Sequence, residues 1–190
     1  NSFVLFISIL FHFQKENNFV GGNYMNKFIF KKPISSLEDR IKKTPKDNPK
    51  RGHWTNERGL SMYVPVDSQT EIIALLKTFN LKGINYIEAM ADFRNCSLNT
   101  VYLEHMSILR YINFSECDRL CADHWNTINY LNCSTWTRSK VRKYRKSHSL
   151  SWHERNDRTT CDLVPAKINA FFLHLGGIAE CKYAYKYINK

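Results

Sequence analysis

The stretch from residue 150 to residue 177 constrains the fold more than any other part of the sequence. Residues 150–154 and 160–164 are rich in apolar and β-favouring side chains, and the polar residues 156–158 between them predict a turn. Pro165 then favours the start of a helix, because a proline in the first helical turn lacks only an N–H that has no partner there. The sequence therefore predicts a unit built as strand, turn, strand and helix.

This unit carries a fixed order of polar residues that resembles a known family. Trp152-His153-Glu154 is followed by the triplet LVP at 163–165, then by Asn169, and finally by His174-Leu-Gly-Gly. The order resembles the WHH-type branch of the HNH, or ββα-Me, nucleases found at the C-termini of bacterial polymorphic toxins and colicin-like bacteriocins. The family pattern is roughly W-H-[HE], a short hairpin, L-V-P, an Ile or Val followed by His, and H-[ST]-G-G. A weaker resemblance extends upstream to about residue 52.

The resemblance implies an α+β fold with a helical N-terminal part and a C-terminal ββα-metal finger, and a metal-dependent endonuclease acting on DNA or RNA. It implies one divalent metal ion, with His153, Asn169 and His174 as ligands and His153 or Glu154 as the catalytic base. In related sites the second residue of the pair is the base, whereas imidazole titrates nearer to neutrality. Mg²⁺ or Mn²⁺ and Zn²⁺ or Ni²⁺ all remain open, because the ligand set mixes imidazole with oxygen.

The chain departs from the family pattern at two positions. Asn169 stands where the family has histidine, and Leu175 stands where it has serine or threonine. An amide oxygen can bind a hard cation but is a poor ligand for a soft one. Two hypotheses follow: an active nuclease, and a catalytically degenerate nucleic-acid-binding protein of the same fold.

The spacing of Asn169 and His174 places the second residue outside the helix. Five residues correspond to roughly 140° of rotation on an ideal helix, so the two side chains do not share one face. We therefore expect His174 to lie at or beyond the helix end, where Gly176 and Gly177 turn the chain.

The charge balance favours a polyanionic partner. Lys and Arg outnumber Asp and Glu by 28 to 17, which gives a formal net charge of +11, and such a surface attracts nucleic acid by releasing counterions. A basic helix capped by Thr135 or Thr137 directly precedes the first strand, which suggests phosphate contacts beside the metal. The expected nucleic-acid contacts are Arg58, Arg138, Lys140, Arg142, Lys143, Arg145 and Lys146.

The family resemblance also implies how such a protein is used. We expect a monomeric toxin that is secreted or delivered and acts in the cytoplasm of a target cell, and an acidic immunity protein that neutralises it in the producer. The apolar run at residues 3–11 is too short to span a bilayer, so we expect no transmembrane segment. We expect a leader or upstream fragment over residues 1–24, a flexible basic linker over 25–51, and the nuclease domain over 52–190.

The middle of the chain predicts two further helices and a strand. Asp67 or Ser68 can cap a helix that reaches residue 79, and residues 84–89 favour a strand. Ser115 and Asp118 fit a capping box at the start of an amphipathic helix that runs to about residue 128.

The six cysteines allow one alternative from another class of protein. They form no paired C-x2-C knuckles of a structural zinc site, and their even number is compatible with disulfides. A small disulfide-linked secreted binding protein is therefore the third hypothesis.

Overall fold

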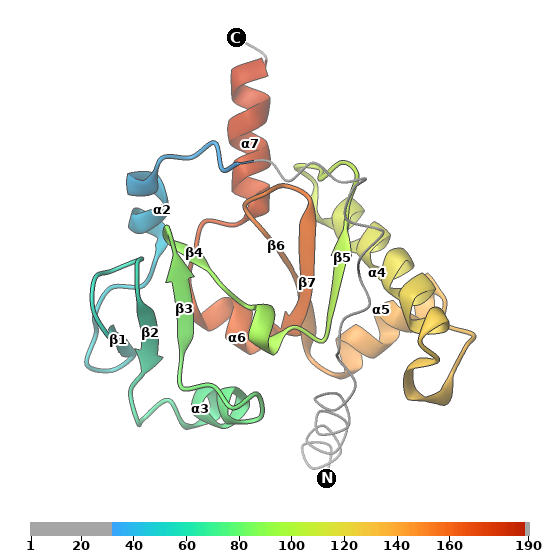
Figure 1. Cartoon of the computed structure of the whole chain (residues 1–190), viewed down its shortest axis with the longest axis horizontal. Coiled ribbons are helices and arrows are strands. Elements are labelled where there is room, and N and C mark those ends of the chain that lie inside the picture. The colour runs from blue at the N-terminus through green and yellow to red at the C-terminus, as the bar shows by residue number, and fades with distance from the viewer. Residues whose placement is uncertain (1–31, 189–190) are drawn as a thin grey trace.

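A computed structural model describes residues 32–188 of the chain (Figure 1). These residues form two antiparallel sheets with helices packed around them. The helices are α2 (Leu37–Lys43), α3 (Thr70–Lys77), α4 (Arg110–Thr127), α5 (Arg138–Ser147), α6 (Ala166–Phe171) and α7 (Gly177–Ile188), with short 3-10 turns at Arg94–Cys96 and Tyr130–Asn132. The strands are β1 (Gly52–Trp54), β2 (Met62–Pro65), β3 (Ile84–Ile87), β4 (Met90–Ala91), β5 (Asn99–Tyr102), β6 (Leu150–Glu154) and β7 (Thr160–Pro165).

The first sheet has the strand order β1-β2-β3-β4, and the connections are all antiparallel. The mixed α+β class is confirmed, but the expectation of a helical N-terminal part is wrong, because this half of the described chain contains four strands. They are two to four residues long, too short to give a clear alternating pattern in the sequence.

The second sheet contains the predicted hairpin and has the order β5-β7-β6. In the β6–β7 pair His153 lies opposite Asp162 and Trp152 lies opposite Leu163. Because successive side chains of a strand point to opposite faces, Leu163 and Val164 enter two different apolar clusters. The cluster around Leu163 contains side chains of α4 and α5, whereas the cluster around Val164 contains side chains of α6. The sheet therefore has α4 and α5 on one face and α6 on the other (Figure 1).

A buried polar network joins α4, α5 and β6. The Asp118 carboxylate accepts hydrogen bonds from Nε and Nη2 of Arg145, both at 2.9 Å, and from Nε1 of Trp152 at 2.8 Å. The Asp118 side chain is only 2% exposed and that of Arg145 only 10%. This network fixes the two helices against the strand that carries His153.

Asp118 is not the capping residue that the sequence predicted. Helix α4 begins at Arg110, five residues before Ser115, and its N-cap Leu109 makes no side-chain cap hydrogen bond. The capping-box prediction is wrong because the Asp118 side chain points into the interior, where it forms an ion pair with Arg145. Cys117 and Cys121, four residues apart on α4, are both fully buried against the sheet.

Ordered structure begins before Gly52, contrary to our expectation of a flexible linker. The chain forms α2, which is capped by Ser36, and the guanidinium of the buried Arg40 donates a hydrogen bond to the carbonyl of Glu88. The segment is also bound to the C-terminal helix, because the fully buried Glu180 accepts hydrogen bonds from Ser35 and from the backbone N–H of Ile34. Long-range partners of this kind leave no periodic signal in a lysine-rich sequence. The predicted leader, residues 1–24, lies outside the described residues.

Two further features bear on the sequence hypotheses. All six cysteines are free, so the structure offers no support for the disulfide-linked alternative. Within residues 32–188, no helix combines the length and the apolar character needed to cross a membrane.

Candidate active site at the end of the β6–β7 hairpin

The two predicted histidines meet at the C-terminal end of β6. The ring of His153 projects from β6 toward the α6 side, and its centroid lies 4.7 Å from that of His174 in an edge-on arrangement. Phe93 packs edge-on against both rings, with centroids 4.7 Å from His153 and 5.5 Å from His174. Phe93 is almost fully buried, so it forms an apolar wall behind the two imidazoles.

His174 lies beyond the end of α6, as its spacing from Asn169 predicted, because the helix ends at Phe171. Nδ1 of His174 lies 2.7 Å from the carbonyl oxygen of Phe172. A ring nitrogen facing a carbonyl must carry the proton, so Nε2 keeps its lone pair. Histidines that bind metal commonly donate their second N–H to such a partner.

The two glycines after His174 allow the chain to pass close to β6. A Cβ atom on Gly177 would lie 2.4 Å from the carbonyl oxygen of Arg155 and 2.7 Å from the sulfur of Met106. A Cβ on Gly176 would lie 3.6 Å from Nε2 of His174 and 3.4 Å from the carbonyl oxygen of Glu154. Gly177 is therefore required by close packing, and both residues place His174 against the end of the strand.

Both imidazoles are neutral at neutral pH. Burial lowers the pKa of His153 well below its usual value, and the nearby His174 and Arg155 lower it further. Burial also lowers the pKa of His174, although the hydrogen bond to the Phe172 carbonyl opposes this effect. A neutral imidazole is the form that can bind a metal ion.

Asn169 approaches the same place from α6. Its amide lies beside the His153 ring, and no donor among the described residues meets the geometry of a hydrogen bond to its buried Oδ1 atom. A buried oxygen without a partner costs roughly 1–3 kcal/mol. Two histidines and one amide oxygen are thus grouped here, whereas residues 32–188 contain no metal-binding group of three or more His, Cys, Asp or Glu side chains.

Glu154 points to the opposite face of β6 from His153, because the two residues are consecutive in the strand. Its carboxylate accepts hydrogen bonds from Nε of Arg110 at 3.1 Å and from Nδ2 of Asn113 at 3.0 Å. The Glu154 side chain is only 3% exposed. Burial raises the pKa of Glu154, and the bonds from Asn113 and Arg110 oppose the shift without cancelling it.

Two of the expected nucleic-acid contacts have internal partners instead. Arg58 donates to Oγ1 of Thr44 at 3.0 Å and to the carbonyls of Ile41 and Thr44 at 2.8 Å, which stabilises the end of α2. Arg145 is buried and bound to Asp118. In both guanidinium groups Nε and Nη2 are engaged within the protein. A sequence cannot reveal such partners, because they come from distant segments.

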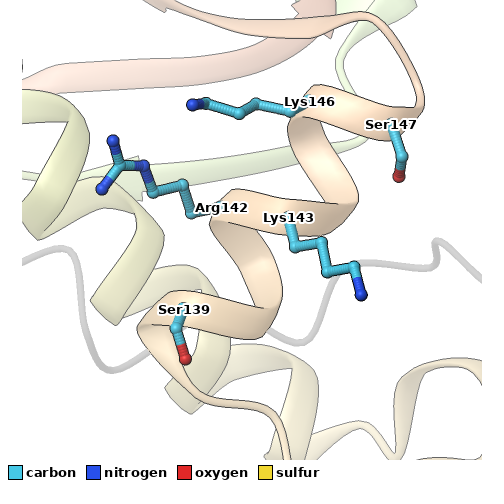
Figure 2. A pocket seen from close by; sticks show the side chains of 5 residues that line it. All are labelled: Ser139, Arg142, Lys143, Lys146 and Ser147. Atoms are coloured by element: carbon cyan, nitrogen blue, oxygen red, sulfur yellow. The ribbon is translucent and has the colours of Figure 1, made fainter.

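The other basic residues of α5 are exposed, but they lie away from the histidines. Val141 of α5 packs with Trp152 and Leu163, on the sheet face opposite His153. Figure 2 shows Arg142 and Lys146 extending to one side of the helix and Lys143 to another. The exposed Arg138 and Lys140 already bond to Ser115 and Thr135, respectively. The helix therefore lies on the sheet face opposite the histidines, and the expectation that its basic surface contacts nucleic acid stays a prediction.

No pattern in the sequence pointed to Phe93, Arg110 or Asn113. None of them belongs to the motif, and they come from segments 40 to 60 residues before His153. Tyr111 and Ile112 are exposed although they are apolar. The first turn of α4 therefore lacks an amphipathic pattern, and the start of the helix at Arg110 could not be predicted.

Comparison with known protein families gives a match over about half of the chain. Residues 83–176 match the sequence model of a family described as the DNase/tRNase domain of colicin-like bacteriocins. The matched range runs from just before β3 to Gly176 and so includes the histidine pair, Asn169, Glu154 and Arg110. No curated protein and no solved structure gives a significant match.

Proposed function

From the match of residues 83–176 to the DNase/tRNase domain of colicin-like bacteriocins we propose that the chain is a metal-dependent toxin endonuclease that hydrolyses phosphodiester bonds in DNA or RNA. The observation that carries the proposal is the convergence of His153, His174 and the unpartnered oxygen of Asn169 at one end of the hairpin. These three groups come from β6, from α6 and from the segment that follows α6.

The residues present fit one divalent cation. His174 offers Nε2 because its Nδ1 faces a carbonyl, and His153 is held neutral by burial. The buried Oδ1 of Asn169 gains a partner when a cation is bound, which removes the cost of leaving it unsatisfied. When bound, the ion stabilises negative charge on the phosphate and on the leaving oxygen.

Glu154 is the proposed general base, because His153 belongs to the ligand group. Its two oxygens each accept one hydrogen bond from the protein, and a carboxylate has about four lone-pair sites, so it can still accept a proton from the attacking water. Burial raises the pKa of Glu154, which makes the carboxylate a stronger base than an exposed one.

The net charge of +11 supports both the substrate class and the proposed partner. The exposed cations of α5 add to long-range attraction of nucleic acid, although they lie on the face opposite the histidines. The same charge fits an acidic immunity protein that protects the producing cell from a monomeric, delivered toxin. The target-cell cytoplasm is the proposed place of action.

The test is a cleavage panel with the full chain, using plasmid DNA and a structured RNA with Mg²⁺, Mn²⁺, Ni²⁺ or Zn²⁺, each with a chelator control. We expect cleavage that the chelator abolishes, and its loss in His174→Ala with the fold retained by circular dichroism. Asn169→His restores the histidine of the family pattern and should shift the preference toward Zn²⁺ and Ni²⁺.

The same panel separates the active from the degenerate reading. If wild type fails to cleave and Asn169→His gains activity, the natural chain is a weakened copy that retains the fold. If neither protein cleaves with any of the four ions, the nuclease proposal is wrong.

A further inference from the structure

Arg110 lies at the start of α4, directly beside the candidate site. Its Nε donates a hydrogen bond to Oε2 of Glu154 at 3.1 Å. The Arg110 side chain is 65% exposed, whereas that of Glu154 is only 3% exposed. A buried carboxylate thus holds one edge of an exposed guanidinium at the end of β6.

The other edge of this guanidinium is unoccupied by protein. Within residues 32–188, Nη1 and Nη2 of Arg110 make no hydrogen bond to another side chain or to the backbone, and Cζ lies 6.0 Å from the centroid of the Phe114 ring. These two nitrogens form a planar fork that matches two oxygens of a phosphate group.

The position of Arg110 is fixed by more than one contact. Asn113, one turn further along α4, donates from Nδ2 to Oε1 of Glu154 at 3.0 Å and to the carbonyl of Ser107 at 2.9 Å. Its Oδ1 accepts the backbone N–H of Ser107 at 2.8 Å. Asn113 thereby binds the loop before α4 and the end of β6 together, so Arg110 needs little reordering to meet a ligand.

The other arginines on this side of the molecule are already occupied. Arg155 is bound through Nε and Nη2 to both oxygens of the fully buried Asp162. Arg94 is bound in the same way to Asp92. Of these three, Arg110 is the guanidinium whose terminal nitrogens remain available.

The charge of Arg110 opposes the rise that burial causes in the pKa of Glu154. The hydrogen bond from Nε to Oε2 therefore keeps the guanidinium beside this carboxylate.

We propose that Arg110 binds the phosphodiester group of the nucleic-acid substrate through Nη1 and Nη2, while Glu154 and Asn113 hold it in position. This inference rests on the proposed nuclease function. It assigns a substrate contact to a residue outside the ββα unit. It also gives α4 a part in the site that the basic helix α5, on the opposite sheet face, does not have.

The experiment compares Arg110→Gln and Arg110→Lys with the matched control Arg119→Gln. Arg119 lies on the same helix and its side chain is 48% exposed, but its charge is taken up by Glu116 and Asp123. Three quantities are measured on the full chain: kcat/KM for cleavage, the salt dependence of duplex binding in a chelator, and Ni²⁺ affinity by calorimetry. Thermal unfolding checks that each variant is folded.

Arg110→Gln should lower kcat/KM by roughly 10- to 100-fold, the range expected for a charged hydrogen bond to a phosphate. Arg110→Lys should fall between it and wild type, because lysine keeps the charge but not the fork. In the chelator, the slope of log affinity against log salt should decrease by about 0.9 for one lost duplex contact. Ni²⁺ affinity should stay equal or rise, because a repelling cation beside the histidines has been removed. Arg119→Gln should change none of these quantities.

Two results would overturn the inference. An unchanged salt slope in Arg110→Gln means that the guanidinium does not contact the backbone, even if wild type cleaves nothing and the nuclease proposal itself fails. A tenfold or greater loss of Ni²⁺ affinity means that Arg110 acts by supporting the metal group. If Arg110→Gln fails to fold, Arg110→Lys, which retains the ion pair with Glu154, replaces it in the kcat/KM and Ni²⁺ measurements. Because lysine keeps the charge, its salt slope should equal that of wild type, and a kcat/KM equal to that of wild type would then overturn the inference.

Discussion

The unpartnered oxygen of Asn169 makes an unusual prediction for a ligand residue: its removal should stabilise the metal-free protein. Leucine has the same number and branching of side-chain heavy atoms as asparagine, and it has no polar atom. Asn169→Leu therefore removes a buried oxygen that has no hydrogen-bond partner among the described residues. The penalty for such an oxygen is about 1–3 kcal/mol, and this is the stabilisation expected in a chelator.

The size of the effect can be read in a thermal unfolding experiment. For a chain of this length each kcal/mol corresponds to roughly 2–4 °C in Tm, so Asn169→Leu should unfold about 2–12 °C higher than wild type in a chelator. Metal at 100 times its Kd stabilises wild type by about 2.7 kcal/mol. The variant should gain less, because it has lost one of three ligands. Asn169→Leu should therefore have a higher Tm than wild type in a chelator, and its Tm should rise less than that of wild type when metal is added.

Asn156→Leu is the matched control. Asn156 is also buried, but its Nδ2 donates to the carbonyl of Leu175 at 2.7 Å and to Oε1 of Glu180 at 3.1 Å. Its replacement should lower Tm and leave the metal response intact. The reasoning about Asn169 is refuted if Asn169→Leu unfolds at or below the wild-type temperature in a chelator, or if it keeps the full stabilisation by metal.

Three further predictions address the rest of the molecule. Asp118→Ala should cost roughly 3–5 kcal/mol in urea unfolding, because it leaves a buried arginine and a tryptophan N–H unpaired; a loss below about 1 kcal/mol contradicts this. Burial by itself would raise the pKa of Glu180, but hydrogen bonds from Ser35, Asn156 and the backbone hold it below its usual value. A lowered pKa stabilises the fold above the unfolded-state pKa of about 4.3, so the stability deficit of Glu180→Gln should be full at pH 7 and shrink as pH falls below about 4. Equal deficits at pH 7 and pH 3 would argue against this role. Neutralising three exposed cations of α5 should reduce the salt slope of duplex binding by up to about 2.7 and leave kcat unchanged, since the helix lies on the face opposite the histidines; a large fall in kcat would place it in the site. The three cations are Arg142, Lys143 and Lys146.

Much of the C-terminal third could be predicted because its determinants are local. The basic helix begins after Thr137, whose side chain caps it as predicted. The strands β6 and β7 lie within one residue of their predicted bounds. His174 lies past the helix end, which follows from helical geometry alone. The apolar side chains of these strands, Trp152, Leu163 and Val164, are buried in the core.

The errors share a different cause, which is long-range pairing. The sequence pattern predicts that Asp118 caps a helix, but its carboxylate is buried and accepts hydrogen bonds from Arg145 and Trp152. Arg58 and Arg145 read as phosphate contacts, but distant acceptors occupy them. In each case a charged side chain has a local interpretation and a tertiary partner, and the tertiary partner decides its role.

The sequence by itself determined the order of the ββα unit and the identity of its polar residues, because strand alternation, turn chemistry and helix periodicity act over a few residues. Only the tertiary structure decided which of those residues meet. The alternation of β6 sends His153 and Glu154 to opposite faces, and the packing of α4 against the strand end brings Arg110 to Glu154 from 44 positions away. The same packing sends the basic helix to the other face of the sheet, because Val141 is buried there with Trp152. Contacts between segments depend on burial of apolar surface across the whole domain, and this is not written in the spacing of any one motif.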